Sequence, residues 1–180
     1  AFSPDPVTTS TSELRVPIAH VDLGPADVPT GFPHTPVGAV GQLAAIEKAV
    51  LESMSLPATR DIHSAWVQPG GPSVEEWELT RNVQSFLAAA RQSGVEKDLT
   101  TLVSATPAAG VVKGSDGPDW TVVCVLMDVQ AVIRTESRMG YGFCSRMAWN
   151  PDEQRWLVAP GAPPAAAPSA WPGSRAAAEA

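Results

Sequence analysis

The chain has 180 residues, a net charge of −7 and no cluster of Lys and Arg of the kind that binds nucleic acid by releasing counterions. Direct nucleic-acid binding is therefore not expected, and the same shortage of basic residues argues against a helix that lies on a membrane surface. Apolar residues make up 44% of the sequence, which is enough for one domain with its own core. No apolar run approaches the roughly 20 residues of a membrane-spanning helix.

The two ends differ in composition from the middle of the chain. Residues 1–15 are rich in Ser, Thr and Pro and lack an apolar period, so we expect a flexible lead-in. Residues 160–180 are a low-complexity Pro/Ala-rich sequence, for which we expect a disordered tail. The intervening residues 16–159 are predicted to form a single domain. The chain begins with Ala1 rather than Met, which fits removal of an upstream signal peptide or membrane anchor and equally well any other boundary.

The first part of this domain predicts an irregular segment and then a helix. Five prolines within residues 16–36 favour an extended, irregular path. Thr35 can cap a helix and Pro36 suits its first position. Apolar residues then recur at helical spacing until Pro57, where we expect this helix to end.

A capping box predicts a second helix. Ser73 is followed three residues later by Glu76, apolar residues recur at helical spacing after it, and Gly94 fits the end of the helix. Residues 66–72, which contain the sequence PGGP, predict the turn between the two helices.

The second half of the chain changes to a period of two, which predicts strands. The expected strands are 102–106, 111–113, 120–133, 140–149 and 155–159. In the two longest of them the large apolar residues, such as Val125, Met127 and Phe143, fall at odd positions, so these residues are predicted to share a buried face. Trp149 and Trp156 lie symmetrically about the last turn and predict a cross-strand pair.

Helices followed by an antiparallel meander predict an α+β fold. We expect the N-terminal helices to pack on a curved antiparallel sheet, as in a cystatin-like or nuclear-transport-factor-2-like roll. A plain two-layer α/β sandwich is the alternative.

The two cysteines, Cys124 and Cys144, have even positions and are predicted to share one face of adjacent strands. Two cysteines are too few for a metal cluster or a disulfide scaffold. A bridge needs Cα atoms within about 7 Å. Direct opposition requires a hairpin centred on Arg134, whereas the polar sequence of the turn places the centre nearer residue 136. One disulfide and two free thiols both remain open.

Two short His/Asp pairs have spacings that occur in metal or acid–base sites: His20 with Asp22, and Asp61 with His63. No third ligand is indicated by spacing, so we favour loop residues that form caps and turns. The sequence therefore predicts neither a metal nor another cofactor.

Three further residues are candidates for contacts with a partner protein: His34, Trp66 and Trp171. His34 stands between two prolines, where hydrogen bonds from its ring to backbone groups are the favoured interpretation. Trp66 falls in a predicted turn, and burial against the sheet is the alternative to a surface contact. Trp171 lies in the predicted tail.

An isomerase-like site would need an acid and a tyrosine inside the cone of a roll. Asp128 and Tyr141 are the candidates, but their positions have opposite parity, so they are predicted to project from different faces of the sheet. No phosphate-binding loop, nucleophile elbow or zinc-protease motif is present. We therefore predict that the chain is not an enzyme.

One part of the sequence resembles a known class of proteins. VPI at 16–18, GP at 24–25 and GFPHTPVGAV at 31–40, followed by a helix rich in small residues, resemble actinobacterial proteins encoded on conjugative plasmids and integrative elements. The W-x6-W spacing at 149–156 fits the C-terminal pattern of this class. The likeness covers about residues 16–158, and the GF-x-HTP-x-GAV stretch is its specific part.

The resemblance implies a non-enzymatic, extracytoplasmic accessory domain of a conjugal transfer apparatus, either secreted or membrane-anchored. Its fold would be similar to the roll domains that act as scaffolds in type IV secretion systems. The implied partners are other proteins of the transfer complex or a second copy of this chain, and a membrane only through a segment missing from this chain. No catalytic residue is implied. The alternatives are a roll-fold ligand binder or isomerase-like enzyme, and a secreted cell-wall-associated protein whose tail is a spacer.

Overall fold

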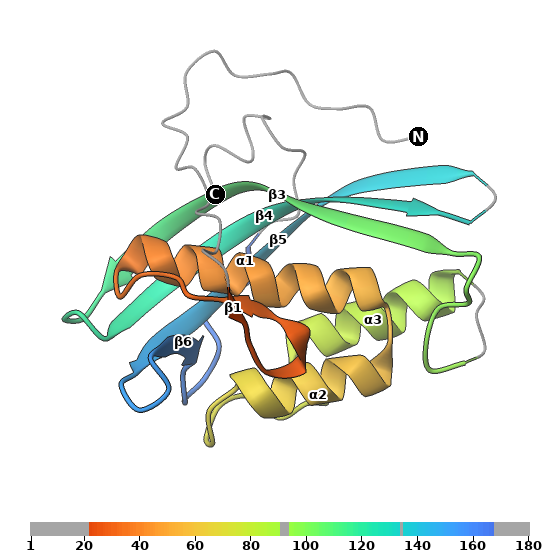
Figure 1. Ribbon diagram of the computed structural model, residues 1–180. Helices are drawn as coiled ribbons and strands as arrows, with labels where there is room; N and C mark the ends of the chain where they lie inside the picture. The colour runs from red at the N-terminus through yellow and green to blue at the C-terminus, as the bar shows by residue number, and fades with distance from the viewer. Residues whose placement is uncertain (1–21, 91–93, 134, 168–180) are drawn as a thin grey trace, which may run out of the picture.

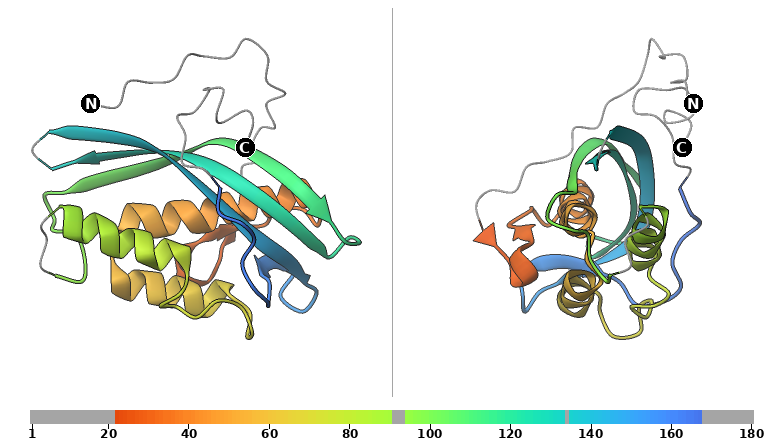
Figure 2. Two further views of the ribbon diagram at one scale, coloured as in Figure 1. Left: turned by 180° about the vertical axis from the view of Figure 1, so that it is seen from behind. Right: turned by 90° about the vertical axis from the view of Figure 1, so that its right-hand side faces the viewer.

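The computed structural model describes residues 22–90, 94–133 and 135–167. As predicted, the fold is α+β: three helices pack on a four-stranded antiparallel sheet, with a small two-stranded sheet beside them. The large sheet has the order β3-β4-β5-β6 and curls around α1 without closing into a barrel (Figure 1; Figure 2). The helices are α1 (Pro36–Ser53), α2 (Leu56–Trp66) and α3 (Glu78–Ala89), and the large sheet consists of β3 (Leu102–Ser115), β4 (Trp120–Val132), β5 (Glu136–Asn150) and β6 (Arg155–Val158).

The proline-rich segment before α1 runs along the outside of the helices. It contains β1 (Asp22–Leu23), a short 3-10 helix (Pro25–Asp27) and β2 (Pro29–Thr30). The Nε2 group of Gln42 on α1 donates a hydrogen bond of 3.0 Å to the Pro29 carbonyl. Its Oε1 atom accepts one of 2.8 Å from the Thr30 hydroxyl. A buried amide of α1 therefore holds this segment in place.

The start of α1 is the one that the sequence predicted. The Thr35 side chain accepts a hydrogen bond of 3.0 Å from the Gly38 amide, and Pro36 occupies the first turn. The helix ends earlier than predicted, because Met54 adopts a left-handed conformation with φ 37°. Most of α1 is buried because the sheet curls around it, with contacts to β3, β4 and β6.

Helix α2 was not predicted. Pro57 was taken as the end of the first helix, but it lies in the first turn of a new one, where proline is well tolerated. Ser55 provides the cap, since its side chain accepts a hydrogen bond of 3.2 Å from the Ala58 amide. Trp66, which was predicted to begin the turn, is the last residue of α2, and the turn follows at residues 67–72.

The predicted capping box forms, but it closes only one turn. The Ser73 hydroxyl accepts from the Glu76 amide at 3.3 Å and donates to the Glu76 carboxylate at 3.0 Å. Trp77 is extended, with ψ 127°, so α3 begins at Glu78 and not immediately after Ser73.

Strand β3 is one long strand where the sequence predicted two short ones. It passes through Pro107, and its register with β4 shifts between Pro107 and Ala109 and again between Val112 and Gly114. Proline is tolerated because β3 is an edge strand. On its outer side, Ala105 is bonded by α1: its carbonyl accepts from Lys48 Nζ at 2.8 Å and its amide donates to Glu52 Oε1 at 3.2 Å.

The register of β4 and β5 confirms the predicted buried face. Asp128 pairs with Gly140, so the hairpin is centred on residue 134. Val125, Met127 and Phe143 are buried. At the next turn Trp149 pairs with Trp156 as predicted, with ring centroids 5.6 Å apart in an edge-to-face arrangement.

After β6 the chain leaves the sheet. The Gly161 amide donates a hydrogen bond of 2.8 Å to the Gly70 carbonyl, and residues 162–167 continue without helix or strand. The predicted lead-in at 1–15 lies outside the described residues. Within the described ranges, no helix is long and apolar enough to cross a membrane.

Candidate functional site

His34 joins the proline-rich segment to the sheet. Its Nε2 atom lies 2.6 Å from Asp119 Oδ1, and its ring stacks on Trp149 with centroids 4.2 Å apart and planes at 9°. The Trp156 indole donates a hydrogen bond of 3.0 Å to the carbonyl of the neighbouring Pro33. These contacts favour a structural role for His34, although its partners are side chains and not the backbone groups that we expected.

We expect His34→Ala to lower the free energy of unfolding by about 1 kcal/mol, because it removes a ring stack and a largely exposed hydrogen bond to Asp119. Urea unfolding measures the change. His34→Phe is the matched control: it keeps a ring on Trp149 and should recover most of the loss. If His34→Phe is as destabilised as His34→Ala, the Asp119 contact and not the stack carries the effect.

Trp66 is not a surface contact residue. Its side chain is fully buried, its Nε1 atom donates a hydrogen bond of 2.9 Å to the Pro25 carbonyl, and the Arg155 guanidinium lies 4.2 Å from its ring centroid. The alternative of burial is therefore the correct one. Trp171 lies outside the described residues.

Of the two His/Asp pairs, only Asp61 and His63 lie wholly within the described residues. His63 Nε2 lies 2.7 Å from the Pro72 carbonyl, and the ring meets Trp77 edge-on, so His63 holds the loop after α2. Asp22 lies in the exposed strand β1, and His20 lies outside the described residues. Within the described ranges no three His, Cys, Asp or Glu residues are grouped to hold a metal ion.

Cys124 and Cys144 form a disulfide between β4 and β5. They are directly opposite each other in the ladder, with Cα atoms 4.0 Å apart. Direct opposition follows from the hairpin centre at residue 134; the alternative centre near 136 was wrong because the polar residues of the turn are part of the strands. The bridge lies on the face of the sheet opposite to the core residues Val125 and Phe143.

Asp128 and Tyr141 lie on opposite faces of the sheet, as their parity predicted. The Asp128 carboxylate accepts a hydrogen bond of 2.9 Å from Nε of Arg138, its diagonal neighbour on β5. This bond holds the pKa of Asp128 below its usual value. Tyr141 is buried on the inner face. An isomerase-like site built on this pair is therefore not formed.

Tyr141 instead meets acids that the sequence analysis missed. Its hydroxyl donates to Glu78 Oε1 at 3.4 Å and accepts a close hydrogen bond from Asn82. Glu47, on α1, is fully buried, and neither of its carboxylate oxygens has a hydrogen-bond partner among the described residues. We call Glu47, Glu78, Asn82 and Tyr141 the acid cluster.

Burial sets the protonation of the acid cluster. It raises the pKa of Glu47 well above its usual value, and the nearby charge of Glu78 raises it further. Burial likewise raises the pKa of Glu78, against the opposing effects of Tyr141 and Arg81. The pKa of Tyr141 is raised by burial and by both carboxylates. The sequence contained an indication of this buried acid, because Glu47 interrupts the apolar spacing of Leu43, Val50 and Leu51 on one face of the helix.

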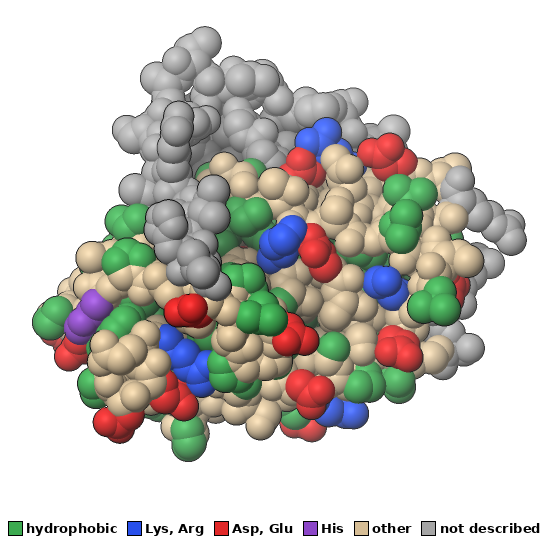
Figure 3. Space-filling view, in the orientation of Figure 1, with side chains coloured by type: hydrophobic (Ala, Val, Ile, Leu, Met, Phe, Trp, Pro, Cys, Tyr) green, Lys and Arg blue, Asp and Glu red, His purple; other side chains and the backbone are tan. Residues whose placement is uncertain are grey.

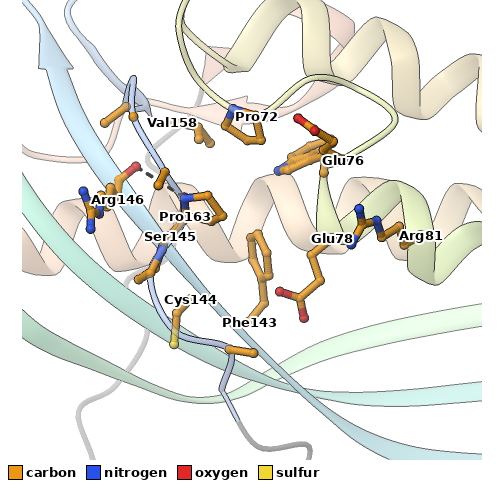
Figure 4. A pocket seen from close by; sticks show the side chains of 16 residues that line it. Pro72, Glu76, Glu78, Arg81, Phe143, Cys144, Ser145, Arg146, Val158 and Pro163 are labelled. Atoms are coloured by element: carbon orange, nitrogen blue, oxygen red, sulfur yellow. Dashed lines mark hydrogen bonds between the residues drawn. The ribbon is translucent and has the colours of Figure 1, made fainter.

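Beside the acid cluster is a cavity of about 330 Å³. It lies between the start of α3, strand β5, the end of β6 and residues 161–166, and Phe143 lies between Pro163 and Glu78 in the view of Figure 4. Glu78 is the member of the acid cluster that lines it, while Glu47 is sealed in the core. The cluster can therefore hold a proton, with Glu78 alone at the cavity wall.

Comparison of the chain with models of protein families, with curated proteins and with solved structures found no match.

Proposed function

We propose that this chain is a non-enzymatic, extracytoplasmic scaffold domain that works through protein–protein contacts in a conjugal transfer apparatus of the type IV secretion kind. The observation that carries the contact role is a group of exposed apolar side chains at one end of the sheet. The disulfide supports an extracytoplasmic location, and the GF-x-HTP-x-GAV resemblance supports a role in conjugal transfer.

The apolar end lies where β3 begins, where β4 meets β5, and in the loop before β3. Leu99 is 98% exposed, Leu102 65% and Met139 58%, although all three are large apolar residues. The apolar end consists of Val95, Leu99, Leu102, Val132, Ile133 and Met139. Hydrophobic side chains stand among charged ones at the right-hand end of Figure 3. Leu102 and Val132 are directly opposite each other in the ladder and share one face of the sheet, whereas Met139 has the opposite parity and lies on the other face. Exposed apolar side chains at one end of a domain are typical of a region that another protein covers.

The disulfide favours an oxidising compartment, because thiols are kept reduced in the cytoplasm of most cells. The resembling stretch has a structural place as well. Its residues Pro33, His34 and Thr35 make the contacts that hold the start of α1 against β5 and β6. The stretch therefore contributes to the architecture of this fold.

Mating assays test the proposal. In a donor strain that carries the parent mobile element, deletion of the gene should lower transfer frequency, and the wild-type gene supplied in trans should restore it. A triple variant of the apolar end (Leu102→Ser, Ile133→Ser, Met139→Ser) should fail to restore it while remaining folded, because it removes contact surface and no core residue.

Leu23→Ser is the matched control, since Leu23 is an equally exposed leucine in β1. It should restore transfer like the wild type. If deletion of the gene leaves the transfer frequency unchanged, the proposed role in conjugal transfer is wrong. Full restoration by the triple variant overturns the role of the apolar end.

We favour this function over a ligand binder or isomerase-like enzyme with a site in the cone. The acid cluster places an acid and a tyrosine on the inner face of the sheet, as such a site needs. However, α1 fills the concave side, with Val40, Leu43 and Ile46 completely buried. A secreted cell-wall-associated protein with a Pro/Ala spacer stays an alternative for the same compartment.

A further inference from the structure

Strand β5 has a free backbone edge beside the cavity. Strand β6 pairs only with residues 147–150 of β5. The Trp149 amide donates to Asp119, on the β4 side, whereas the Arg146 carbonyl accepts from Ala159, on the β6 side. Successive residues of a strand direct their backbone groups to opposite sides. The Cys144 N–H and C=O and the Arg146 N–H therefore point to the side where β6 has ended.

The course of the chain after Ala159 explains why β6 stops there. The Ala159 amide donates a hydrogen bond of 2.8 Å to the Arg146 carbonyl, and because backbone groups alternate along a strand, the next donor toward β5 would be the Gly161 amide. The Gly161 amide bonds to Gly70 instead. Pro163, two residues further on, has no N–H, and both Pro163 and Pro164 line the cavity. Among the described residues no hydrogen bond reaches the Cys144 backbone, so residues 161–166 lie over this edge without pairing with it.

The opposite wall of the cavity holds a further donor without an acceptor. Trp77 is 2% exposed and lines the cavity, and its indole Nε1 is buried without a partner among the described residues. The Arg146 Nε atom, on the β5 side, is likewise buried without a hydrogen-bond partner among the described residues. Phe143 supplies apolar surface between them. Such donors fit the carbonyl groups of a peptide backbone.

We propose that the free edge of β5 at Cys144 and Arg146 binds an extended peptide segment of a partner protein by strand addition, in the place now held by residues 161–166. The proposal rests on the proposed scaffold function and names the form of one contact. A peptide N–H donates to the Cys144 carbonyl, and peptide carbonyls accept from the Cys144 and Arg146 amides and from Trp77 Nε1. The chain's own segment occupies the site weakly because its Gly161 amide is bonded to Gly70 and Pro163 cannot donate.

Amide hydrogen exchange, followed by NMR on the full-length protein with its disulfide intact, tests the free edge. The Cys144 and Arg146 amides should exchange at least about tenfold faster than the Phe143, Ser145 and Met147 amides, which point toward β4. Equal rates for the two sets overturn the proposal, because the edge is then already paired.

A variant in which threonine replaces the three prolines, and residue 163 thereby gains an N–H, tests whether the edge accepts a strand. In Pro160→Thr/Pro163→Thr/Pro164→Thr the segment can pair with β5, so the Cys144 and Arg146 amides should slow by about tenfold or more. The control, Ala162→Thr/Ala165→Thr/Ala167→Thr, adds the same three side chains and no N–H, and should leave both rates unchanged. If exchange of the Cys144 and Arg146 amides slows in neither variant, or slows equally in both, the proposal is wrong.

Binding in trans is measured with two eight-residue peptides. One has the sequence of residues 160–167, and the other carries threonine at its three proline positions. The threonine peptide should bind the wild-type protein at least about tenfold more tightly and shift the Trp77 indole resonance, because it offers a donor to Cys144. Equal affinities, or no binding by either peptide, overturn strand addition. These measurements need no mating assay, so their failure is distinguishable from failure of the proposed apparatus.

Discussion

Replacing Glu47 with Gln is expected to raise the free energy of unfolding at pH 8 by about 2 kcal/mol or more, and to change it little near pH 4.5. Glu47 is fully buried without a hydrogen-bond partner among the described residues, and it lies near the charge of Glu78. The wild-type protein must either keep a proton on this carboxyl or bury an unpaired charge. Gln has the same shape and never ionises.

The direction of the pH dependence follows from the raised pKa of Glu47. Between the pKa of the unfolded chain, about 4.3, and the higher pKa of the folded protein, the folded state binds more protons than the unfolded state. Raising the pH through this window therefore destabilises the fold, by at most about 1.4 kcal/mol per pH unit for one group. Glu78 has a raised pKa and acts in the same direction.

Urea unfolding between pH 4.5 and pH 9 measures this dependence. The wild-type protein should lose stability as the pH rises, and Glu47→Gln should flatten the curve. Glu75→Gln is the control, because Glu75 is exposed and its substitution should change stability by less than about 0.5 kcal/mol at any pH. A wild-type curve that rises from pH 5 to pH 8 would show that Glu47 is not held in its protonated form.

Loss of the Cys124–Cys144 disulfide is expected to lower the free energy of unfolding by about 3 kcal/mol. The bridge closes a loop with a sequence separation of 20 residues, and opening that loop gives the unfolded chain more conformations. For a domain of this size the loss corresponds to a decrease in the unfolding temperature of about 10 °C.

Thermal unfolding with and without a thiol reductant measures this effect. The double variant Cys124→Ala/Cys144→Ala should have the same midpoint with and without the reductant, below that of the oxidised wild type and close to that of the reduced wild type. A wild-type midpoint that the reductant leaves unchanged, although mass spectrometry shows both thiols free, contradicts the expected contribution. Because β4 and β5 are also joined by a long ladder, the reduced protein should keep its fold at room temperature.

Features encoded by local spacing could be predicted from the sequence. Odd-numbered apolar residues such as Val125 and Phe143 predicted the buried face, since a strand alternates strictly between its two sides. Thr35 and Pro36 predicted the start of α1 in the same way, because capping depends on adjacent residues. The symmetric positions of Trp149 and Trp156 were enough to predict their pairing.

Features that depend on contacts distant in sequence could not be predicted in this way. Helix α2 was not predicted because Pro57 fits both the end of one helix and the first turn of the next. The left-handed conformation of Met54, which ends α1, decides between these two possibilities. The acid cluster brings Glu47 from α1 and Glu78 from α3 to Tyr141 of β5, and no spacing indicates that approach. The free edge of β5 depends on where β6 ends, and the hydrogen bond from Gly161 to Gly70 that takes the chain away from β5 joins residues far apart in sequence.

The two rims of the sheet differ in a way that limits how copies of the molecule can join. Along β3, a proline, two bulges and the side chains of Lys48 and Glu52 on Ala105 interrupt the backbone groups that another molecule would need. Growth of a continuous sheet from one copy to the next, as in a fibril, requires two open rims. We therefore expect concentrated solutions of this protein to resist fibril formation.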